Sequence, residues 1–417
     1  MATNSPPTRL DRRLNAFDAV VIGLGSMIGA GVFAAIGPAA REAGSGLLLG
    51  LLIAGIVAYC NATSSAQLAA LYPESGGTYA YGRYRLGAFW GYLAGWCFVV
   101  GKLASCAAMA LTFGHYADQD VARPLAIGAV LALTIVNYAG VQKTAALTRG
   151  IVAVVLLALV VAVAASLLGG NAESGRLTPL VDSDHGPFGI LQAAGLLFFA
   201  FAGYARIATL GEEVAEPQRT IPRAIPLALG IAMAVYTAVA LSTIAVLGSD
   251  VLAISDAPLA DAVKAGSLSE LAPIVRIGAT VASLGVLLSL LVGVSRTLFA
   301  MASNRDMPGI LSHVHARNKV PDYAELLVGA IVIAVVAAVD LRHAIGFSSF
   351  GVLLYYAIAN ASAFTLEAHE RKWPRALTVL GIAGCLVLAF SLPWQSVLAG
   401  AGLVTAGAAV YVVRKLT

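Results

Sequence analysis

The stretch GLGSMIGAGVF occupies residues 23–33, inside the first long apolar segment of the chain, and four of its eleven residues are glycine. Glycine destabilises a helix interior by about 1 kcal/mol relative to alanine. In lipid, every backbone N–H and C=O needs a partner, and non-helical backbone survives only where it is packed in protein or lines a cavity. The stretch therefore predicts a break in a membrane-spanning helix. Close packing of small residues against a neighbouring helix is the alternative.

The rest of the sequence places this stretch in a membrane. Of the 417 residues, 59% are hydrophobic and 12% are charged, and the mean hydropathy is +0.85. That is too little charge to cover a soluble domain of this size, and long apolar runs recur from end to end. We therefore predict an all-α polytopic membrane protein with about twelve transmembrane helices, at residues 17–40, 45–71, 88–117, 124–139, 147–169, 188–211, 224–248, 273–302, 325–340, 344–366, 376–391 and 393–413.

The distribution of positive charge predicts the orientation. Of the 26 Lys and Arg residues, eighteen fall on the side of the N-terminus, six on the other side and two within spans. Because cytoplasmic loops carry the excess of positive charge, both termini are expected in the cytoplasm and the chain in the inner (plasma) membrane. Residues 1–16 are interpreted as a cytoplasmic tail, since the first apolar run is too long for a signal peptide. The four cysteines fall in apolar runs and are expected to be free thiols.

The sixth predicted span has a second irregular stretch, LLFFAFAGYARIATLGEEV, at residues 196–214. An aromatic cluster of Phe198, Phe199 and Phe201 runs into Gly203 at mid-span; ordinary packing is the alternative reading of these rings. Paired interruptions at corresponding positions of two halves indicate a transporter site between inverted repeats. Freed N–H groups suit a carboxylate, and freed carbonyls suit an ammonium. Together, two breaks suit an amino acid zwitterion.

Four motifs resemble the amino acid–polyamine–organocation superfamily, and especially its bacterial amino acid permeases of the cationic-amino-acid-transporter-like branch. They are GSMIGAGVF at 25–33, YPESGGTYAY at 72–81, FFAFAGYARIATLGEEVAEPQRTIPRAI at 198–225 and SRTLFAMASNRDMP at 295–308. The resemblance implies a five-plus-five inverted repeat (LeuT-like) at residues 17–169 and 188–366, with discontinuous first and sixth helices. Two extra C-terminal helices occupy residues 376–413.

The resemblance also implies a substrate site between the two broken helices. Its residues are Ser26, Met27, Ile28, Gly29, Ala30 and Gly31 in the first segment, and Phe198, Phe199, Ala200, Phe201, Ala202 and Gly203 in the second. The N–H groups of residues 29–31 would face the substrate carboxylate. The carbonyls of Met27, Phe199 and Ala202 would face its amino group, and Phe199 would cover the substrate as a lid.

Lys102 is a charged residue in the middle of the third predicted span. Such residues are rare and functional by default, since translocon scales put them at about 2.5–3.5 kcal/mol unfavourable at mid-helix. Lys102 shares a helix face with Ser105, and we expect it to couple transport to protons or to replace a sodium ion. Snorkelling to the interface and a static ion pair are the alternatives. Ser289 is the single candidate hydroxyl for a sodium site on the eighth span.

Further coupling or gating candidates follow the second irregular stretch. Arg206 is expected to have a structural or gating role, and Glu212 and Glu213 could pair in a cytoplasmic gate or simply be solvated. Tyr356 on the tenth span lines the substrate path or makes core hydrogen bonds. A cationic substrate side chain would meet Lys102 and Arg206 but no mid-membrane carboxylate, so the charges favour a neutral L-amino acid. An acidic amino acid is the alternative if Arg206 faces the pocket.

The sequence therefore predicts a secondary active transporter of L-amino acids that works by alternating access, coupled to protons or sodium or acting as an exchanger. A transporter or antiporter of cationic amino acids or polyamines is the first alternative. A sensor built on a transporter fold is another, and so is a membrane enzyme, although we find no catalytic constellation. We expect no cofactor, no metal and no nucleic-acid partner, with membrane lipid around the chain.

Overall fold

The computed structural model describes residues 15–29, 31–72, 76–140, 145–181, 186–208 and 214–416. This described part is helical and holds no β-sheet, so the predicted all-α class is confirmed. Its α-helices are α1 (Ala16–Met27), α2 (Gly31–Ala43), α3 (Leu47–Leu71), α4 (Thr78–Leu86), α5 (Ala88–Ala117), α6 (Ala122–Tyr138), α7 (Ala145–Leu168), α8 (Gly186–Phe201), α9 (Ala205–Ala208), α10 (Pro217–Ile254), α11 (Pro258–Lys264), α12 (Ala272–Ser303), α13 (Asp322–Ala338), α14 (Leu341–Phe364), α15 (Arg375–Ser391) and α16 (Trp394–Leu416).

The long helices identify a multi-pass membrane protein. Within the described ranges, eight helical stretches are long and apolar enough to cross a bilayer, and three more apolar helices are shorter. The predicted ranges fall on helices, and the range 88–117 coincides with α5. The predicted end at residue 248 coincides with a kink inside α10, where Gly248 has φ 72°. Only α4 and α11 were not predicted, because both are short.

Helix α5 lies at the centre of the bundle. In its most apolar 18-residue window, 83% of the residues are buried, against 17% in α16, which therefore lies at the periphery. Its two main neighbours are α12 and α14. The backbones of α5 and α14 touch, because a Cβ on Gly351 would stand 3.0 Å from the carbonyl oxygen of Cys97 and 3.1 Å from the Cα of Gly101. Small residues allow this close approach of membrane helices.

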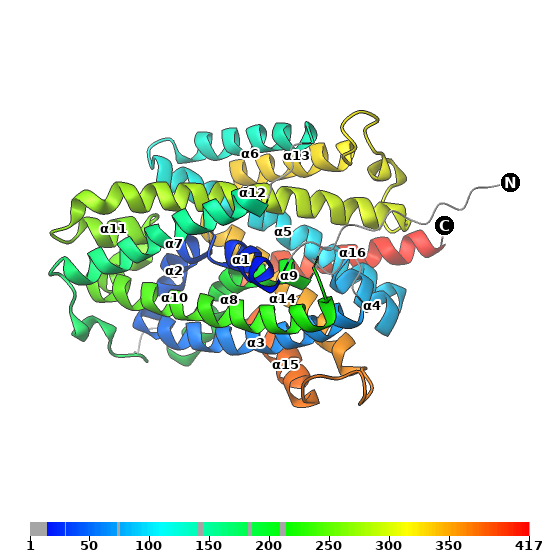
Figure 1. Cartoon of the computed structure of the whole chain (residues 1–417), viewed down its shortest axis with the longest axis horizontal. Coiled ribbons are helices and arrows are strands. Elements are labelled where there is room, and N and C mark those ends of the chain that lie inside the picture. Colours follow the sequence, from blue (N-terminus) through cyan, green and yellow to red (C-terminus); the bar gives the residue numbers. More distant parts are fainter. Residues whose placement is uncertain are drawn as a thin grey trace.

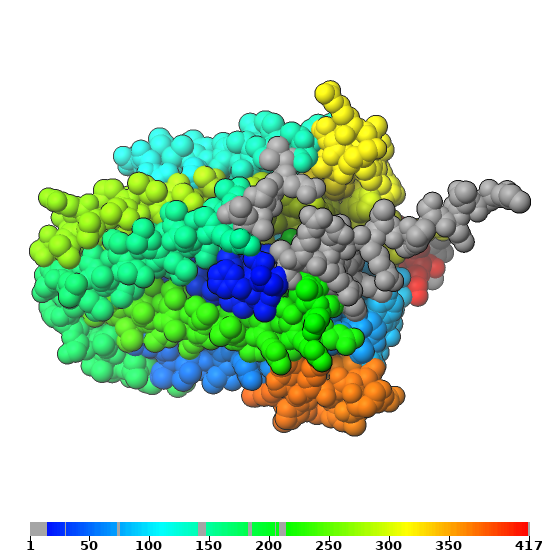
Figure 2. All heavy atoms as spheres, in the orientation of Figure 1, coloured from blue at the N-terminus to red at the C-terminus, as the bar shows by residue number. Residues whose placement is uncertain are grey.

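The bundle is elongated, with distinct ends (Figure 1). Helix α4 and the last turns of α16 lie at one end, called here the α4 end, and α11 lies at the opposite end, called the α11 end. Helix α1 is short and lies on the face shown in Figure 2, between α7 and α10, which it also contacts. The four cysteines are free and buried, as expected.

Candidate substrate site at two helix breaks

The first break lies where the glycine-rich stretch predicts it. Helix α1 ends at Met27 and α2 begins at Gly31. Ile28 caps α1, since its N–H donates to the carbonyl of Leu24 at 2.7 Å, and its ψ of 0° departs from the helix. Met27 and Ile28 are both buried, with 0% and 2% of their surface exposed. Ala30 lies outside the described residues.

The second break is a change of helix type. Helix α8 ends at Phe201, the 3₁₀ turn η3 covers Ala202–Tyr204, and α9 follows at Ala205–Ala208. A 3₁₀ turn closes its hydrogen bonds one residue earlier than an α-helix, and such turns within a helix often mark functional hinges. Gly203, the predicted point of interruption, lies inside this turn.

The two breaks touch each other. A Cβ on Gly203 would stand 2.2 Å from the carbonyl oxygen of Ser26 and 2.6 Å from the nitrogen of Met27. A Cβ on Gly31 would stand 2.6 Å from the Cα of Ala200. Only glycine fits at both contacts, so the structure brings the two predicted segments together. It leaves no gap at these contacts, and the cavity beside Gly31 and Ala200 has a volume of about 10 Å³, the space of one water.

Two tyrosine hydroxyls satisfy carbonyls at the breaks. The hydroxyl of Tyr236, on α10, lies 2.5 Å from the carbonyl oxygen of Met27 and 2.9 Å from that of Ala200. The hydroxyl of Tyr356, on α14, donates to the carbonyl of Ala202 at 3.2 Å. Met27 and Ala202 are two of the carbonyls expected to face a substrate amino group. The carbonyl of Ala200 joins them, although the sequence did not single it out for this role.

The aromatic cluster holds these tyrosines in place. Phe201 meets the ring of Tyr236 edge-on at 5.0 Å, and Phe198 meets Tyr356 edge-on at 5.8 Å. Both phenylalanines are fully buried, whereas Phe199 is half-buried. Phe199 is therefore the one of the three rings that keeps part of its surface exposed.

Sequence reasoning named Tyr356 but missed Tyr236. A signal for it does exist. A tyrosine in the middle of an apolar span, as in AMAVYTAVAL at 232–241, must find a partner for its hydroxyl inside the protein. The sequence could not show which carbonyl the hydroxyl finds, because Tyr236 and Met27 lie 209 positions apart.

The structure separates Lys102 from Ser105 in their contacts. The hydroxyl of Ser105 lies 2.6 Å from that of Ser348 on α14, so Ser105 joins two helices. The side chain of Lys102 lies beside Cys106 and is only 8% exposed. Among the residues that the structure describes, its ammonium has no hydrogen-bond or ion-pair partner. A buried charge without a partner is costly, so Lys102 stays a candidate for a role in transport.

Among the remaining coupling and gating candidates, the structure describes Arg206 and Ser289. Arg206 is exposed on α9. Ser289 donates to the carbonyl of Gly285 in its own helix at 3.0 Å. Glu212 and Glu213 lie outside the described residues. Asn360, which shares a face with Tyr356, makes core hydrogen bonds: it donates to Asn61 at 2.6 Å.

At the α11 end of the bundle, hydrogen bonds of Tyr116 and an ion pair connect several helices. Its hydroxyl donates to the carbonyl of Phe33 on α2 at 3.2 Å and accepts the N–H of Leu259 on α11 at 3.4 Å. Arg276 donates to the backbone carbonyl of Tyr116 at 3.1 Å. An ion pair between Glu42 and Arg342 joins α2 to α14. These contacts connect the second half of the first broken helix to its surroundings.

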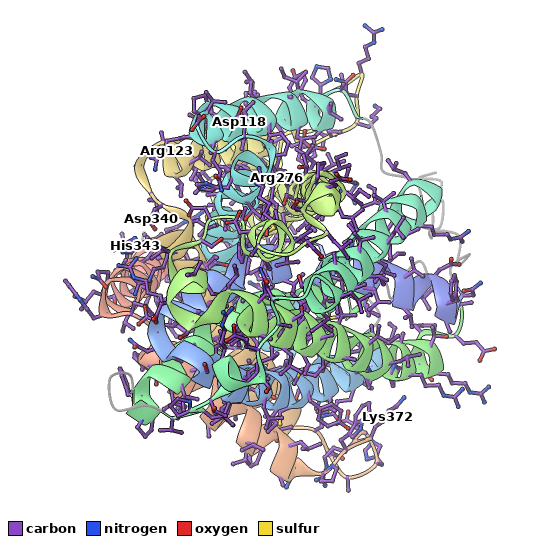
Figure 3. The ribbon with its side chains drawn as sticks, turned by 90° about the vertical axis from the view of Figure 1, so that its left-hand side faces the viewer. Asp118, Arg123, Arg276, Asp340, His343 and Lys372 are labelled. Atoms are coloured by element: carbon purple, nitrogen blue, oxygen red, sulfur yellow. The ribbon has the colours of Figure 1, made fainter. Side chains whose placement is uncertain are left out.

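Figure 3 views this end directly and shows Asp340 and His343 close together, with Arg123 nearby. Asp340 caps α14, because its carboxylate accepts the N–H of His343 at 2.8 Å. Burial alone would raise the pKa of Asp340. The hydrogen bonds from the His343 backbone and ring, with the charges of His343 and Arg123, outweigh burial and lower this pKa below its ordinary value.

A second set of ionic contacts lies around the first half of the broken helix and the α4 end. The carboxylate of Asp18 in α1 pairs with Arg149 of α7 at 2.5 Å. Asp306, after α12, accepts Arg83 at 2.6 Å and the hydroxyl of Tyr79 at 2.7 Å, both from α4. Each half of the first broken helix is thus held by its own ionic or hydrogen-bonded contacts.

Comparison with known proteins agrees with this architecture. The sequence profile of the family described as amino acid permease matches residues 18–414. An uncharacterised transporter of Mycobacterium tuberculosis is 62% identical over 98% of this chain and 93% of its own length. The branched-chain amino acid permease of Bacillus subtilis is 26% identical over 95% of this chain and 91% of its length. Human cationic amino acid transporter 4 is 27% identical over 88% of this chain and 61% of its length.

A bundle of long apolar helices, two of them interrupted where they meet, defines a multi-pass membrane protein of the transporter class. The family match then gives the particular group. The chain belongs to the amino acid permease family, within the amino acid–polyamine–organocation superfamily. Because this family and the named relatives are transporters, the chain is a transporter and not an enzyme.

Proposed function

We propose that the chain is a secondary active transporter of neutral L-amino acids that works by alternating access. The substrate backbone binds between the two breaks, at Ser26–Gly31 and Phe198–Gly203. The observation that carries the proposal is the meeting of these segments, where a Cβ on Gly203 would stand 2.2 Å from the Ser26 carbonyl oxygen. Two interrupted helices in contact make a two-sided backbone site that closes and opens as the helices move.

The chemistry of the site suits a zwitterion. The carbonyl oxygens of Met27 and Ala200 converge on one hydroxyl, so they would also converge on an ammonium group. The ammonium has three N–H donors and a full charge, which makes stronger hydrogen bonds than a neutral hydroxyl. The start of α2 at Gly31 offers backbone N–H groups to the carboxylate. Phe199 covers the substrate from its half-buried position.

Neutral substrates are favoured by the charges around the site. Among the described residues, the buried acids are Asp18, Asp322 and Glu325, and all three lie in the first turn of a helix, away from the breaks. A cationic side chain would therefore find no buried carboxylate of the described residues there, and Lys102 would repel it. The name of the branched-chain amino acid permease among the relatives points the same way. The name of the cationic amino acid transporter makes cationic substrates the competing candidate.

Topology and coupling complete the proposal. Ten of the twelve spans form two inverted repeats at 17–169 and 188–366, and the last two spans lie at 376–413. Both termini face the cytoplasm from the inner membrane, since eighteen of the 26 Lys and Arg residues fall on the side of the N-terminus. Protons couple through Lys102. Sodium is the weaker choice, because Ser289 is the single hydroxyl candidate and donates to its own helix.

Counterflow in proteoliposomes tests this function. Liposomes containing the purified chain and unlabelled L-leucine are diluted into labelled L-leucine, and the assay is repeated with each L-amino acid in turn. We expect transient accumulation of neutral amino acids and competition by other neutral amino acids, but not by lysine, arginine or spermidine. Strongest competition by lysine or arginine would establish the cationic alternative. A wild-type chain that exchanges no amino acid would overturn the proposal.

A further inference from the structure

The hydroxyl of Tyr236 joins the two breaks. It lies 2.5 Å from the carbonyl oxygen of Met27, at the end of α1, and 2.9 Å from that of Ala200, in the last turn of α8. These carbonyls belong to different broken helices and, in the proposed topology, to different repeats. One side chain from a third helix, α10, therefore holds both segments at the point where they meet.

The position of this hydroxyl is fixed by packing. Tyr236 is 2% exposed, and its ring lies edge-on to Phe201 at 5.0 Å. A hydroxyl has a single proton, so it donates to only one of the two carbonyls at a time. At any moment, therefore, one of the two carbonyls lacks this side-chain donor, and buried polar backbone in a membrane protein finds its donors within the protein itself.

An amino group between the breaks would do the same work better than the hydroxyl does. A substrate ammonium would donate to both carbonyls at once, and the hydroxyl of Tyr236 would then be dispensable as a donor. Without substrate, the closed arrangement depends on Tyr236, since no other side-chain donor to these two carbonyls occurs among the hydrogen bonds of the described residues. The hydroxyl thus stands in for the ammonium.

We infer that Tyr236 allows the carrier to close and reorient without substrate, so that the protein performs net transport and not only exchange. This inference rests on the proposed function, because it assumes that an amino acid binds at the breaks. A carrier that cannot close when empty is restricted to exchange, because its binding site changes from one side of the membrane to the other only when substrate is bound. The donor from Tyr236 removes that restriction by pairing the carbonyls during the empty return step. Tyr236 is therefore a positioning residue for the return step rather than a determinant of substrate recognition.

The test compares net transport with exchange in the variant Tyr236→Phe, which keeps the ring and removes the hydroxyl. Both rates are measured in proteoliposomes with the neutral L-amino acid that the wild type exchanges fastest. Net uptake into liposomes without internal amino acid requires empty return, whereas counterflow does not. We expect net uptake to fall about tenfold, since leaving buried carbonyls unpaired is expensive. We expect counterflow to stay within about twofold of the wild type, because the bound ammonium supplies the missing donors.

Tyr92→Phe is the matched control. Tyr92 is 1% exposed, and its hydroxyl has no hydrogen-bond partner in the described part of the chain, so its loss should change neither rate. Equal losses of net uptake and counterflow in Tyr236→Phe would overturn the inference, and so would unchanged net uptake. A wild type that exchanges nothing would instead defeat the proposed function. A wild type that exchanges amino acids but shows no net uptake would leave that function standing and refute empty return.

Discussion

Gly203 and Ser26 lie in backbone contact, although they are 177 positions apart in the sequence: a Cβ on Gly203 would stand 2.2 Å from the Ser26 carbonyl oxygen. One residue belongs to the 3₁₀ turn of the second break and the other to the last turn of α1. Because the contact joins backbone to backbone, no side-chain rotation relieves an added methyl group. An added methyl group therefore fits only if the main chains of the two segments move apart.

Gly203→Ala should abolish transport by forcing the two breaks apart. The added methyl group meets a carbonyl, and overpacking of this kind costs about 1–3 kcal/mol. Counterflow and thermal unfolding of the detergent-purified variant measure the two effects. Gly230→Ala is the control, since a Cβ there meets nothing within 4 Å. That variant should keep full counterflow and equal or slightly higher stability. Full activity of Gly203→Ala would show that the contact is not needed for transport.

Lys102→Met should remove proton coupling while preserving the volume of the side chain. If Lys102 carries the coupling proton, wild-type uptake rises when the external pH is lowered against a fixed internal pH. The variant should lose that response but retain counterflow, because exchange needs no net proton movement. Uptake measured across imposed pH gradients distinguishes these results. A variant that keeps the wild-type response to the gradient would assign Lys102 a purely structural role.

Arg149→Gln should loosen the first half of the broken helix. Arg149 pairs with Asp18 of α1 at 2.5 Å, and the arginine side chain is 53% exposed, so the pair is worth no more than about 1 kcal/mol. A loss of that size should speed labelling of an introduced Ser26→Cys from the cytoplasmic side by about threefold to fivefold. Arg219→Gln breaks a pair whose side chains are 78% and 70% exposed and serves as the control. Equal labelling rates in the two variants would show that the Asp18–Arg149 pair does not restrain the first half of the broken helix.

Asp340 should make the stability of the α11 end depend on pH. Its folded pKa lies below the ordinary value of 3.8, so its charge stabilises the folded chain above about pH 4. That contribution is lost as the pH falls through the lowered pKa. Asp340→Asn retains a good helix cap but no charge. Its melting temperature should therefore be lower than that of the wild type at pH 7, and the two should converge below about pH 4.

Asp340→Ala separates capping from charge. It removes the acceptor for the N–H of His343 as well, which should cost about 1 kcal/mol beyond Asp340→Asn at any pH. Melting curves of the three chains in one detergent, recorded from pH 3 to pH 7, measure both effects. A constant gap between wild type and Asp340→Asn over this range would contradict the charge effect.

The sequence predicted both breaks because unpaired backbone groups are costly in lipid, so residues that disrupt a helix are informative there. Four glycines within residues 23–33, and Gly203 after an aromatic cluster, are hard to explain in unbroken membrane helices. The helix positions followed from the lengths of apolar runs, as with α5 at residues 88–117. Helices α4 and α11 were missed, because a helix of nine or seven residues has no such signal.

The partners at the site could not be predicted in the same way. Tyr236 and Tyr356 reach carbonyls 209 and 154 positions away, and the choice depends on how α10 and α14 pack around the breaks. The pair of Glu42 and Arg342 spans 300 positions. Composition and spacing describe one helix at a time, whereas these contacts depend on how different helices pack together. The direct contact of the two breaks also needed the tertiary structure.

The burial of the thiols has a practical consequence for spectroscopy. Cys60, Cys97 and Cys385 are at most 1% exposed, and Cys106 is 0% exposed, so reagents in solution do not reach their sulfur atoms in this arrangement. A single cysteine added to an exposed loop would then take a fluorophore or spin label without removal of any native residue. Distances between two such labels, one beside α4 and one beside α11, would follow the motion of the otherwise unmodified chain in real time.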